Sequence, residues 1–129
     1  MTEHSKRIVN RVYDAIIAGE AEQVFAALHP DFCAEIPPVV PWGGSHHGAV
    51  AFGRDVLPSV LGVVDMATLQ VRSLFGEGEK VFATATLKTI DHLNEILIGE
   101  EWTVRDGKVA SLRVFYFDPR PLLTSAGIS

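Results

Sequence analysis

The sequence lacks several features that mark particular classes of protein. Of its 129 residues only Cys33 is a cysteine, which excludes an internal disulfide and a metal site built from several thiolates. It has no cluster of basic residues and a net charge of −5, so we expect binding neither to nucleic acid nor to an anionic membrane. No apolar stretch is long enough to cross a bilayer, and the polar residues 1–7 do not resemble a secretion signal. These absences favour a cytoplasmic protein.

The composition that remains is typical of one folded domain. Hydrophobic residues make up 47% of the chain and charged residues 21%, which is ordinary for a globular protein and unlike a disordered one. A chain of this length can bury a sizeable core. We therefore treat residues 1–129 as a single domain.

The first half of the sequence is predicted to be mainly helical. Apolar residues recur with helical spacing over residues 2–18 and 21–28, and Gly19 and Pro30 stop these two helices. Residues 37–48 are rich in proline and glycine and are predicted to form an irregular loop. A third helix is expected to begin near Gly48 or Ala49, with Pro58 kinking or restarting it.

The second half is predicted to form a sheet. Asp106-Gly107 is a strong signal for a hairpin turn between the last two strands. Because helices precede most strands, the sequence predicts an α+β fold and not alternating βαβ units. The predicted strands cover residues 32–36, 67–75, 80–91, 94–105 and 108–118.

Glu100 is the most informative residue of the predicted sheet. Side chains alternate between the two faces of a strand, so Glu100 shares a face with Ile96, Ile98, Trp102 and Val104. An isolated charge on such an apolar face is too costly to keep. Glu100 therefore faces a cavity, or it forms an ion pair or reaches solvent. Its candidate ion-pair partners are Arg72, Lys88 and Arg113.

The last strand predicts a covered outer face. Residues 110–118 are apolar on one side, and Val109, Phe115 and Phe117 make the other side apolar as well. A sheet with two apolar faces usually has something covering each of them. In a chain this short we expect the second cover to be another subunit, as a twofold homodimer.

Several motifs, taken in order, resemble the nuclear transport factor 2-like (NTF2-like) superfamily, and more narrowly its SnoaL-like and ketosteroid isomerase-like branch. The resemblance covers nearly the whole chain. The motifs are Ala18-Gly19-Glu20, Leu28-His29-Pro30-Asp31-Phe32, Pro41-Trp42-Gly43-Gly44 with Gly48, the segment from Glu101 to Val109, and Phe115-Tyr116-Phe117-Asp118.

This resemblance implies a cone-shaped fold, in which three N-terminal helices pack on a curved, mostly antiparallel sheet and enclose an apolar pocket. Members of the superfamily include isomerases, polyketide cyclases, dehydratases, hydrolases and proteins without catalysis, so the fold alone does not fix the function. Counted along the motifs, Glu100 falls where the isomerases have a protonated aspartate and where the SnoaL-type cyclases have a histidine. The aspartate that serves as base is replaced by Ile36 in the isomerase pattern and by Val114 in the cyclase pattern.

Three further residues are candidates for moving a proton, beside Glu100. Tyr13 is one residue away from the position of the isomerases' tyrosine, a turn of about 100° on a helix. It is either catalytic or a core tyrosine at the pocket edge. Asp118 is either a base at the pocket mouth or a cap for the turn into Pro119. His46, like its neighbour His47, is either an acid–base group at the pocket rim or an exposed loop residue.

The expected function is that of a small-molecule enzyme without a metal or organic cofactor. Glu100 would orient or protonate the oxygen of a small hydrophobic carbonyl compound during isomerisation, cyclisation or dehydration through an enol. A protein that only binds a small hydrophobic ligand, and a purely structural dimer, remain alternatives. The residues expected to line the pocket are Ile36, Trp42, Phe52, Ile98, Trp102, Val114 and Tyr116.

Overall fold

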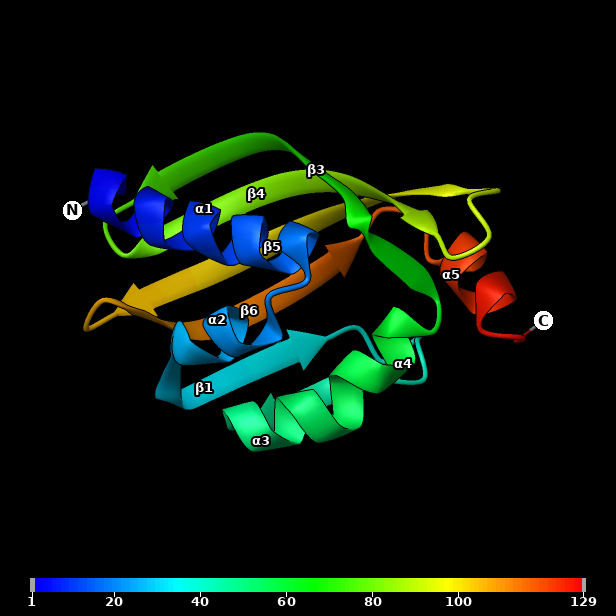
Figure 1. Cartoon of the computed structure of the whole chain (residues 1–129), viewed down its shortest axis with the longest axis horizontal. Helices are drawn as coiled ribbons and strands as arrows, with labels where there is room; N and C mark the ends of the chain where they lie inside the picture. Colours follow the sequence, from blue (N-terminus) through cyan, green and yellow to red (C-terminus); the bar gives the residue numbers. More distant parts are fainter. Residues whose placement is uncertain (1, 129) are drawn as a thin grey trace.

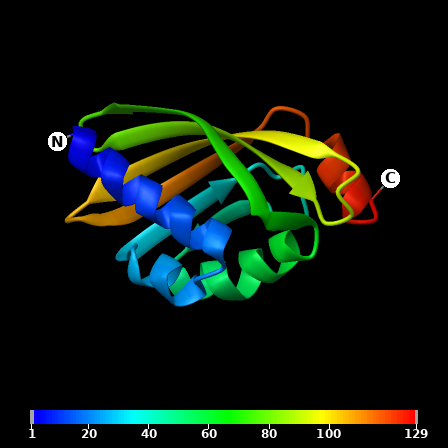
Figure 2. The ribbon, with the colours of Figure 1, turned by 45° about the horizontal axis from the view of Figure 1, so that its top comes forward.

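Six strands form one curved sheet that bends around the helices (Figures 1 and 2). The computed structural model describes residues 2–128. The order across the sheet is β2-β1-β6-β5-β4-β3, and every neighbouring pair is antiparallel except β1 and β6. The predicted α+β class, with a curved and mostly antiparallel sheet, is confirmed. The strands are β1 (Leu28–Ile36), β2 (Gly44–His47), β3 (Val64–Glu77), β4 (Lys80–Thr89), β5 (Glu95–Arg105) and β6 (Lys108–Tyr116).

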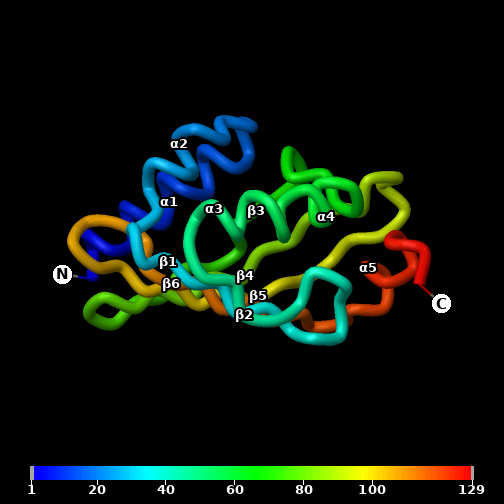
Figure 3. Tube along the Cα trace, turned by 90° about the horizontal axis from the view of Figure 1, so that it is seen from below, coloured from blue at the N-terminus to red at the C-terminus, as the bar shows by residue number. Residues whose placement is uncertain are grey.

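Helices α1 to α4 lie on one side of this sheet (Figure 3). None of the helices within residues 2–128 is long and apolar enough to span a membrane. The helices are α1 (Thr2–Ala18), α2 (Ala21–Ala26), α3 (Ala49–Ala51), the π-helical turn η1 (Phe52–Val56), α4 (Leu57–Leu61) and α5 (Arg120–Ser125).

Helix α1 has both predicted ends. Its apolar stripe is buried against the sheet, with Val9, Val12 and Tyr13 at most 1% exposed. Gly19 ends the helix with a φ of 74°, a conformation that glycine adopts at little cost. The amide of Glu20 then reaches back to the carbonyl of Ala15 (2.9 Å), which satisfies one of the free carbonyls at the helix end.

The segment between α2 and β1 differs from the prediction. The helix expected to reach residue 28 ends at Ala26, and the strand expected at residue 32 begins at Leu28. The reason is pairing with β6, because the amide of Val109 donates to the Ala27 carbonyl (2.9 Å) and Leu28 lies opposite Val109. Pro30 is tolerated in β1 because the register shifts between Leu28 and Cys33.

The loop predicted over residues 37–48 is irregular only in its first part. Residues Gly44–His47 form β2, which pairs with β1 from Ile36 opposite Gly44 to Cys33 opposite His47. This short polar strand satisfies backbone groups at the edge of β1. A strand of four polar residues has no apolar alternation, so its sequence does not reveal it.

Pro58 restarts the third helical segment, as predicted. It lies in the first turn of α4, where a residue without an N–H group is tolerated. The preceding residues Phe52–Val56 form the wider π-helical turn η1. The chain therefore passes from α3 to α4 through a local widening, and the side chains of Phe52 and Val56 reach the interior.

The hairpin between β5 and β6 also agrees with the sequence. Asp106 and Gly107 both have positive φ angles, 55° and 75°, as a type I′ turn requires. The other strand ends shift by a few residues: β3 extends to 64–77, β4 stops at Thr89 and β6 stops at Tyr116. Such shifts at the ends of elements are ordinary.

Helix α5 was not predicted. Its Leu122 is 2% exposed, and the Ser125 hydroxyl donates to the Val63 carbonyl (3.2 Å). The helix covers the end of the sheet near β4 and β5 (Figure 1). A proline in the first helical turn, Pro121, was the available sequence signal.

The face of the sheet away from α1 to α4 carries exposed apolar side chains. Phe75, Phe115 and Phe117 are 62%, 45% and 82% exposed. The rings of Phe82 and Phe115 lie 6.0 Å apart and cover Gly99, where an added Cβ would lie 2.8 Å from Phe82. This outer face is therefore unusually apolar for a surface.

Candidate functional site

Glu100 points to the concave side of the sheet, as the alternation in β5 predicts. Its neighbours on that face, Ile98 and Trp102, are 6% and 3% exposed. The possible cationic partners lie elsewhere: Arg72 donates to the Thr86 hydroxyl (2.9 Å), Lys88 lies opposite Glu95, and Arg113 lies opposite Glu101. Glu100 is thus an acidic group in an apolar interior, without ion pairing to these three residues.

Tyr13 of α1 holds this carboxyl in place. Its hydroxyl donates a hydrogen bond to Glu100 Oε1 (2.7 Å), and it accepts one from the indole Nε1–H of Trp102 (2.8 Å). The Tyr13 and Trp102 rings meet edge to face, with centroids 5.5 Å apart. Trp102, Tyr13 and Glu100 therefore form one chain of hydrogen bonds from an indole to a carboxyl.

The offset of Tyr13 from the isomerase position does not turn its hydroxyl away from Glu100. Val12 and Tyr13 are both 1% exposed, because α1 lies inside the curve of the sheet and is buried over a wide angle. The structure brings Tyr13 together with Glu100. Tyr13 is not among the side chains that border the two cavities described below, so it positions Glu100 and does not itself reach a ligand there.

Burial dominates the acid–base properties of this group. It raises the pKa of Glu100 from 4.5 to about 7, and the hydrogen bond from Tyr13 works in the opposite direction. Burial, followed by the charge of Glu100, raises the pKa of Tyr13 well above its ordinary value. Near neutral pH Glu100 is therefore present in both its neutral and its charged form, whereas Tyr13 keeps its proton.

Glu100 Oε2 is left free to meet a ligand. Among residues 2–128 only Tyr13 bonds to this carboxyl, and it uses Oε1. Glu100 borders two cavities, of about 90 Å³ and about 230 Å³. The side chains that border both are Phe52, Leu57, Met66, Glu100 and Leu112.

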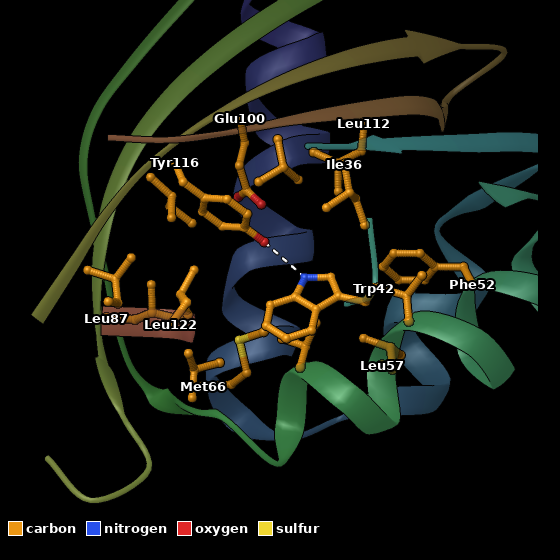
Figure 4. A pocket seen from close by; sticks show the side chains of 16 residues that line it. Ile36, Trp42, Phe52, Leu57, Met66, Leu87, Glu100, Leu112, Tyr116 and Leu122 are labelled. Atoms are coloured by element: carbon orange, nitrogen blue, oxygen red, sulfur yellow. Dashed lines mark hydrogen bonds between the residues drawn. The ribbon is translucent and has the colours of Figure 1, made fainter. Parts of the chain in front are cut away.

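The smaller cavity contains a second pair of a tryptophan and a tyrosine. The indole Nε1–H of Trp42 donates to the hydroxyl of Tyr116 (3.0 Å), and Figure 4 shows both side chains at the cavity with Glu100 beside Tyr116. Burial raises the pKa of Tyr116 to about 12 despite the opposing bond from Trp42. Tyr116 therefore remains a protonated hydroxyl at any pH near neutrality.

The larger cavity leads to the surface. It is bordered by Gly19, Glu20 and Ala21 at the turn between α1 and α2 and by Leu61 of α4, all of which are exposed. The smaller cavity, by contrast, is bordered only by buried and partly buried residues. A ligand that reaches Glu100 from outside therefore has a path through the larger cavity.

Two predicted proton-transfer residues lie apart from Glu100. Asp118 pairs with Arg120, which donates to its carboxylate from the side chain (2.8 and 2.9 Å) and from the backbone (3.1 Å). The side-chain bond from Arg120 is the largest cause of its lowered pKa. Asp118 borders neither cavity, and its geometry matches the turn-capping alternative.

His46 also lies outside the site. It belongs to the edge strand β2 and not to a loop, and its Nε2 is 2.9 Å from the backbone oxygen of Trp42. Neither His46 nor His47 borders the cavities. Within residues 2–128 no group of three or more His, Cys, Asp and Glu side chains is placed to hold a metal ion.

All the residues expected to line a pocket do border a cavity. Trp102 borders the larger one, Phe52 borders both, and the other five border the smaller one. Sequence reasoning missed several wall residues. Among them, the inward position of Leu112 follows from its sharing a strand face with Val114, whereas nothing local marks Met66 or Leu122.

Solved structures share this fold. An NTF2-like protein from Burkholderia thailandensis matches with a TM-score of 0.80 and 20% identity, over 100% of this chain and 99% of that protein. A proposed polyketide cyclase from Sinorhizobium meliloti matches with a TM-score of 0.71 and 20% identity, over 84% and 94%. A proposed ketosteroid isomerase from Kribbella flavida matches with a TM-score of 0.75 and 20% identity, over 91% and 80%.

The comparisons establish the fold and leave the activity open. No protein-family model matches the sequence, and no curated protein matches it. The chain has the NTF2-like fold, which confirms the architecture that the motifs predicted. Proteins of similar structure at this low identity need not share a reaction.

Proposed function

We propose that this protein is an acid–base enzyme that shifts a proton on a small apolar carbonyl compound, as an isomerase does. The observation that carries the proposal is Glu100 itself. It is a carboxyl in an apolar cavity, fixed through Oε1 by Tyr13 (2.7 Å) and open at Oε2. A general base works best when its pKa lies near the operating pH, and burial raises the pKa of Glu100 to about 7.

The chemical step requires one carboxyl only. The Glu100 carboxylate takes a proton from the carbon next to the carbonyl, and the electron pair of that C–H bond becomes the C=C bond of an enolate. The π pair of the carbonyl moves to its oxygen. When the substrate has a C=C bond next to that carbon, the intermediate is a dienolate. Return of the proton from Glu100 to its far carbon re-forms the carbonyl, moves the C=C bond and regenerates the carboxylate. No electron acceptor or metal takes part in this balance.

Glu100 therefore takes a different role from the one that its position in the superfamily implies. The position of the isomerase base is Ile36, and that of the cyclase base is Val114. Both are buried and border the smaller cavity. Within residues 2–128, the walls of the two cavities carry no second carboxyl except Glu20 at the outer mouth. An acid–base reaction in this site therefore depends on Glu100.

Hydrogen exchange into a model ketone tests the proposal without knowledge of the natural substrate. 2-Tetralone is a two-ring apolar ketone with acidic protons beside its carbonyl. In deuterated buffer we expect the protein to accelerate their replacement by deuterium, followed by NMR. Glu100→Gln should lower this acceleration by at least about 100-fold, the usual contribution of a general base.

Glu101→Gln is the matched control. Glu101 follows Glu100 in β5 but faces the outer side, where it lies 3.7 Å from Lys80 Nζ, so its variant should exchange protons as fast as the wild type. Exchange at the wild-type rate in Glu100→Gln contradicts the proposal. A failure of the wild-type protein to bind 2-tetralone or to speed its exchange contradicts it equally.

A second candidate function is binding without catalysis. The observation that favours it is the apolar side chains at the two positions where the superfamily's bases would stand, Ile36 and Val114. A binding protein would hold 2-tetralone with similar affinity in the wild type and in Glu100→Gln, and neither would speed the exchange.

We also propose that two copies of the chain associate through the outer face of the sheet. The support is the exposed aromatic group of Phe75, Phe115 and Phe117, since aromatic side chains often dominate the binding energy of interfaces. Sedimentation at micromolar concentration should give the mass of a dimer, and Phe117→Ser should weaken the dimer by about tenfold or more.

The control for the dimer is Val50→Ser. Val50 is 79% exposed but lies in α3, on the helical side of the sheet, so its variant should leave the mass unchanged. A monomeric wild-type protein at micromolar concentration contradicts the dimer. An equal effect of the two variants contradicts the assignment of the interface to the outer face.

A further inference from the structure

We propose that the hydroxyl of Tyr116, supported by Trp42, binds the carbonyl oxygen of the substrate in the smaller cavity, while the apolar body of the substrate fills the larger one. This inference rests on the proposed proton transfer by Glu100 and specifies the substrate. The compound would be a small ketone or aldehyde with its carbonyl at one end and one or two apolar rings at the other.

The first support is a free hydrogen-bond donor at the cavity. The Tyr116 hydroxyl accepts a bond from Trp42 Nε1 (3.0 Å), and it donates to no residue within 2–128. A tyrosine hydroxyl carries one donor in addition to its acceptor sites. Because Tyr116 borders the smaller cavity, its proton is available to an oxygen placed there.

The bond from Trp42 makes this donor stronger. A hydroxyl that accepts a hydrogen bond becomes polarised and donates more readily, because successive bonds in a chain reinforce each other. Trp42 is 3% exposed, so water competes little for its indole N–H. We therefore assign Trp42 as a positioning residue, which fixes the direction of the Tyr116 hydroxyl and does not touch the substrate oxygen.

The second support is the placement of Tyr116 relative to Glu100. Glu100 lies opposite Val114 in the pairing of β5 with β6, and Tyr116 lies two residues further along β6 on the same face. Such diagonal neighbours are about 7–8 Å apart, and Figure 4 shows both side chains directed toward the smaller cavity. This spacing leaves room for an oxygen at Tyr116 and for the adjacent carbon at Glu100 Oε2.

The donor would then act where charge develops. When Glu100 takes the proton, the carbonyl oxygen gains negative charge, and a hydroxyl fixed in an apolar cavity stabilises that charge better than mobile water does. Tyr13 is not available for this role because its proton is directed to Glu100 Oε1. Tyr116 is the second tyrosine of the chain, and its hydroxyl at the smaller cavity can supply this hydrogen bond.

The third support is the shape of the space around Glu100. The larger cavity, of about 230 Å³, is smaller than the usual drug-sized pocket of roughly 300–1,000 Å³. Its walls are apolar except for Glu20 and Glu100. Its mouth is bordered by exposed residues, whereas the smaller cavity is bordered only by buried and partly buried residues. A substrate therefore enters with its carbonyl end first and leaves its apolar rings in the larger cavity.

The test compares two ligands that differ only in the carbonyl. 2-Tetralone has the oxygen, and tetralin is the corresponding hydrocarbon with nearly the same shape. Calorimetric titration should show that Tyr116→Phe lowers the affinity for 2-tetralone by about five- to tenfold, the value of one hydrogen bond, and leaves the affinity for tetralin unchanged. Trp42→Phe should also lower the ratio of the affinity for 2-tetralone to the affinity for tetralin, by about two- to threefold.

Infrared spectra supply a second measurement. The carbonyl stretching band of bound 2-tetralone, labelled with carbon-13, should shift to higher frequency in Tyr116→Phe, because the carbonyl loses its donor. A circular dichroism melt confirms that each variant is folded. Should Tyr116→Phe not fold, Trp42→Phe alone decides, through the affinity ratio and the position of the carbonyl band.

The outcomes separate this inference from the proposed function. If the wild type exchanges protons into 2-tetralone but Tyr116→Phe keeps the affinity ratio and the band position, the oxygen site is wrong and Glu100 remains the base. If Tyr116→Phe lowers the ratio but the wild type does not exchange protons, the oxygen site holds and catalysis is wrong. Equal losses for 2-tetralone and tetralin overturn the assignment of a hydrogen bond to Tyr116.

Discussion

The interior contains two pairs of a tryptophan and a tyrosine with the same hydrogen bond and different consequences. Trp102 donates to Tyr13 (2.8 Å), and Trp42 donates to Tyr116 (3.0 Å). The Tyr13 hydroxyl donates its own hydrogen bond to Glu100. Tyr116 keeps its proton free at a cavity.

The difference between the pairs follows from where the tyrosine stands. Tyr13 comes from α1 and is enclosed between the helix and β5, so its hydroxyl must find a partner within the protein. Tyr116 comes from the end of β6 and is only partly buried, so its hydroxyl can stay available to a ligand. The same two side chains thus fix an acidic group in one place and leave a donor in the other.

The largest effect expected to distinguish the two pairs is a change of stability with pH. It arises from Glu100, which is bonded to Tyr13 of the first pair. Its pKa is 4.5 ordinarily and about 7 in the folded protein, so the folded protein keeps a proton that the unfolded chain has lost. The free energy of unfolding should therefore fall as pH rises from about 4.5 to about 7 and stay level above. The loss amounts to about 3 kcal/mol.

Urea denaturation of the wild type and of Glu100→Gln measures this loss. Between about pH 4.5 and about pH 8 the wild type should lose about 3 kcal/mol relative to the variant, because other titrating groups contribute equally to both proteins. A constant difference between the two proteins over this range would mean that burial does not raise the pKa of Glu100.

A smaller effect is expected from removing each tyrosine hydroxyl in turn. Tyr13→Phe leaves the buried indole N–H of Trp102 without its acceptor and takes a donor from Glu100, so it should cost about 2 kcal/mol in the free energy of unfolding. Tyr116→Phe likewise leaves the buried indole N–H of Trp42 without its acceptor, but it takes no donor from a carboxyl, so it should cost less, about 1 kcal/mol. Urea denaturation at about pH 7 measures both.

The pH dependence of proton exchange gives the same comparison a second measure. Because the bond from Tyr13 lowers the pKa of Glu100, Tyr13→Phe should move the midpoint of the exchange rate to higher pH. Tyr116→Phe should reduce the rate with little change in the midpoint. Equal costs in stability and equal midpoints for the two variants would show that the pairs do not differ as described.

Local patterns were enough to predict the elements that depend on neighbouring residues. The alternation of β5 placed Glu100 on the inner face, and Asp106-Gly107 located the hairpin. Strand β2 and helix α5 were missed because their stability comes from contacts with distant segments, such as that of Ser125 with Val63 (3.2 Å). The four polar residues of β2 form a strand because the edge of β1 pairs with them.

The site itself was predicted in part, for a similar reason. Inward residues such as Ile98 and Val114 follow from strand alternation. The contact between Tyr13 and Glu100 joins residues 87 positions apart, and it depends on how α1 rotates inside the sheet. The sequence offered Asp118 as a candidate base. Its partner Arg120, however, lies only two residues away, and Asp118 pairs with it and borders neither cavity.

The π-helical turn η1 makes the volume of the site sensitive to chain length. A π-turn contains one residue more than the α-helical turn it replaces. Phe52, at its start, borders both cavities and packs edge to face on Phe32 (5.4 Å). Deleting Gly53 would convert η1 into an ordinary turn and rotate Phe52 by about 100° relative to α4. An insertion or deletion of one residue here, with no change in any polar group, would reshape both cavities at once.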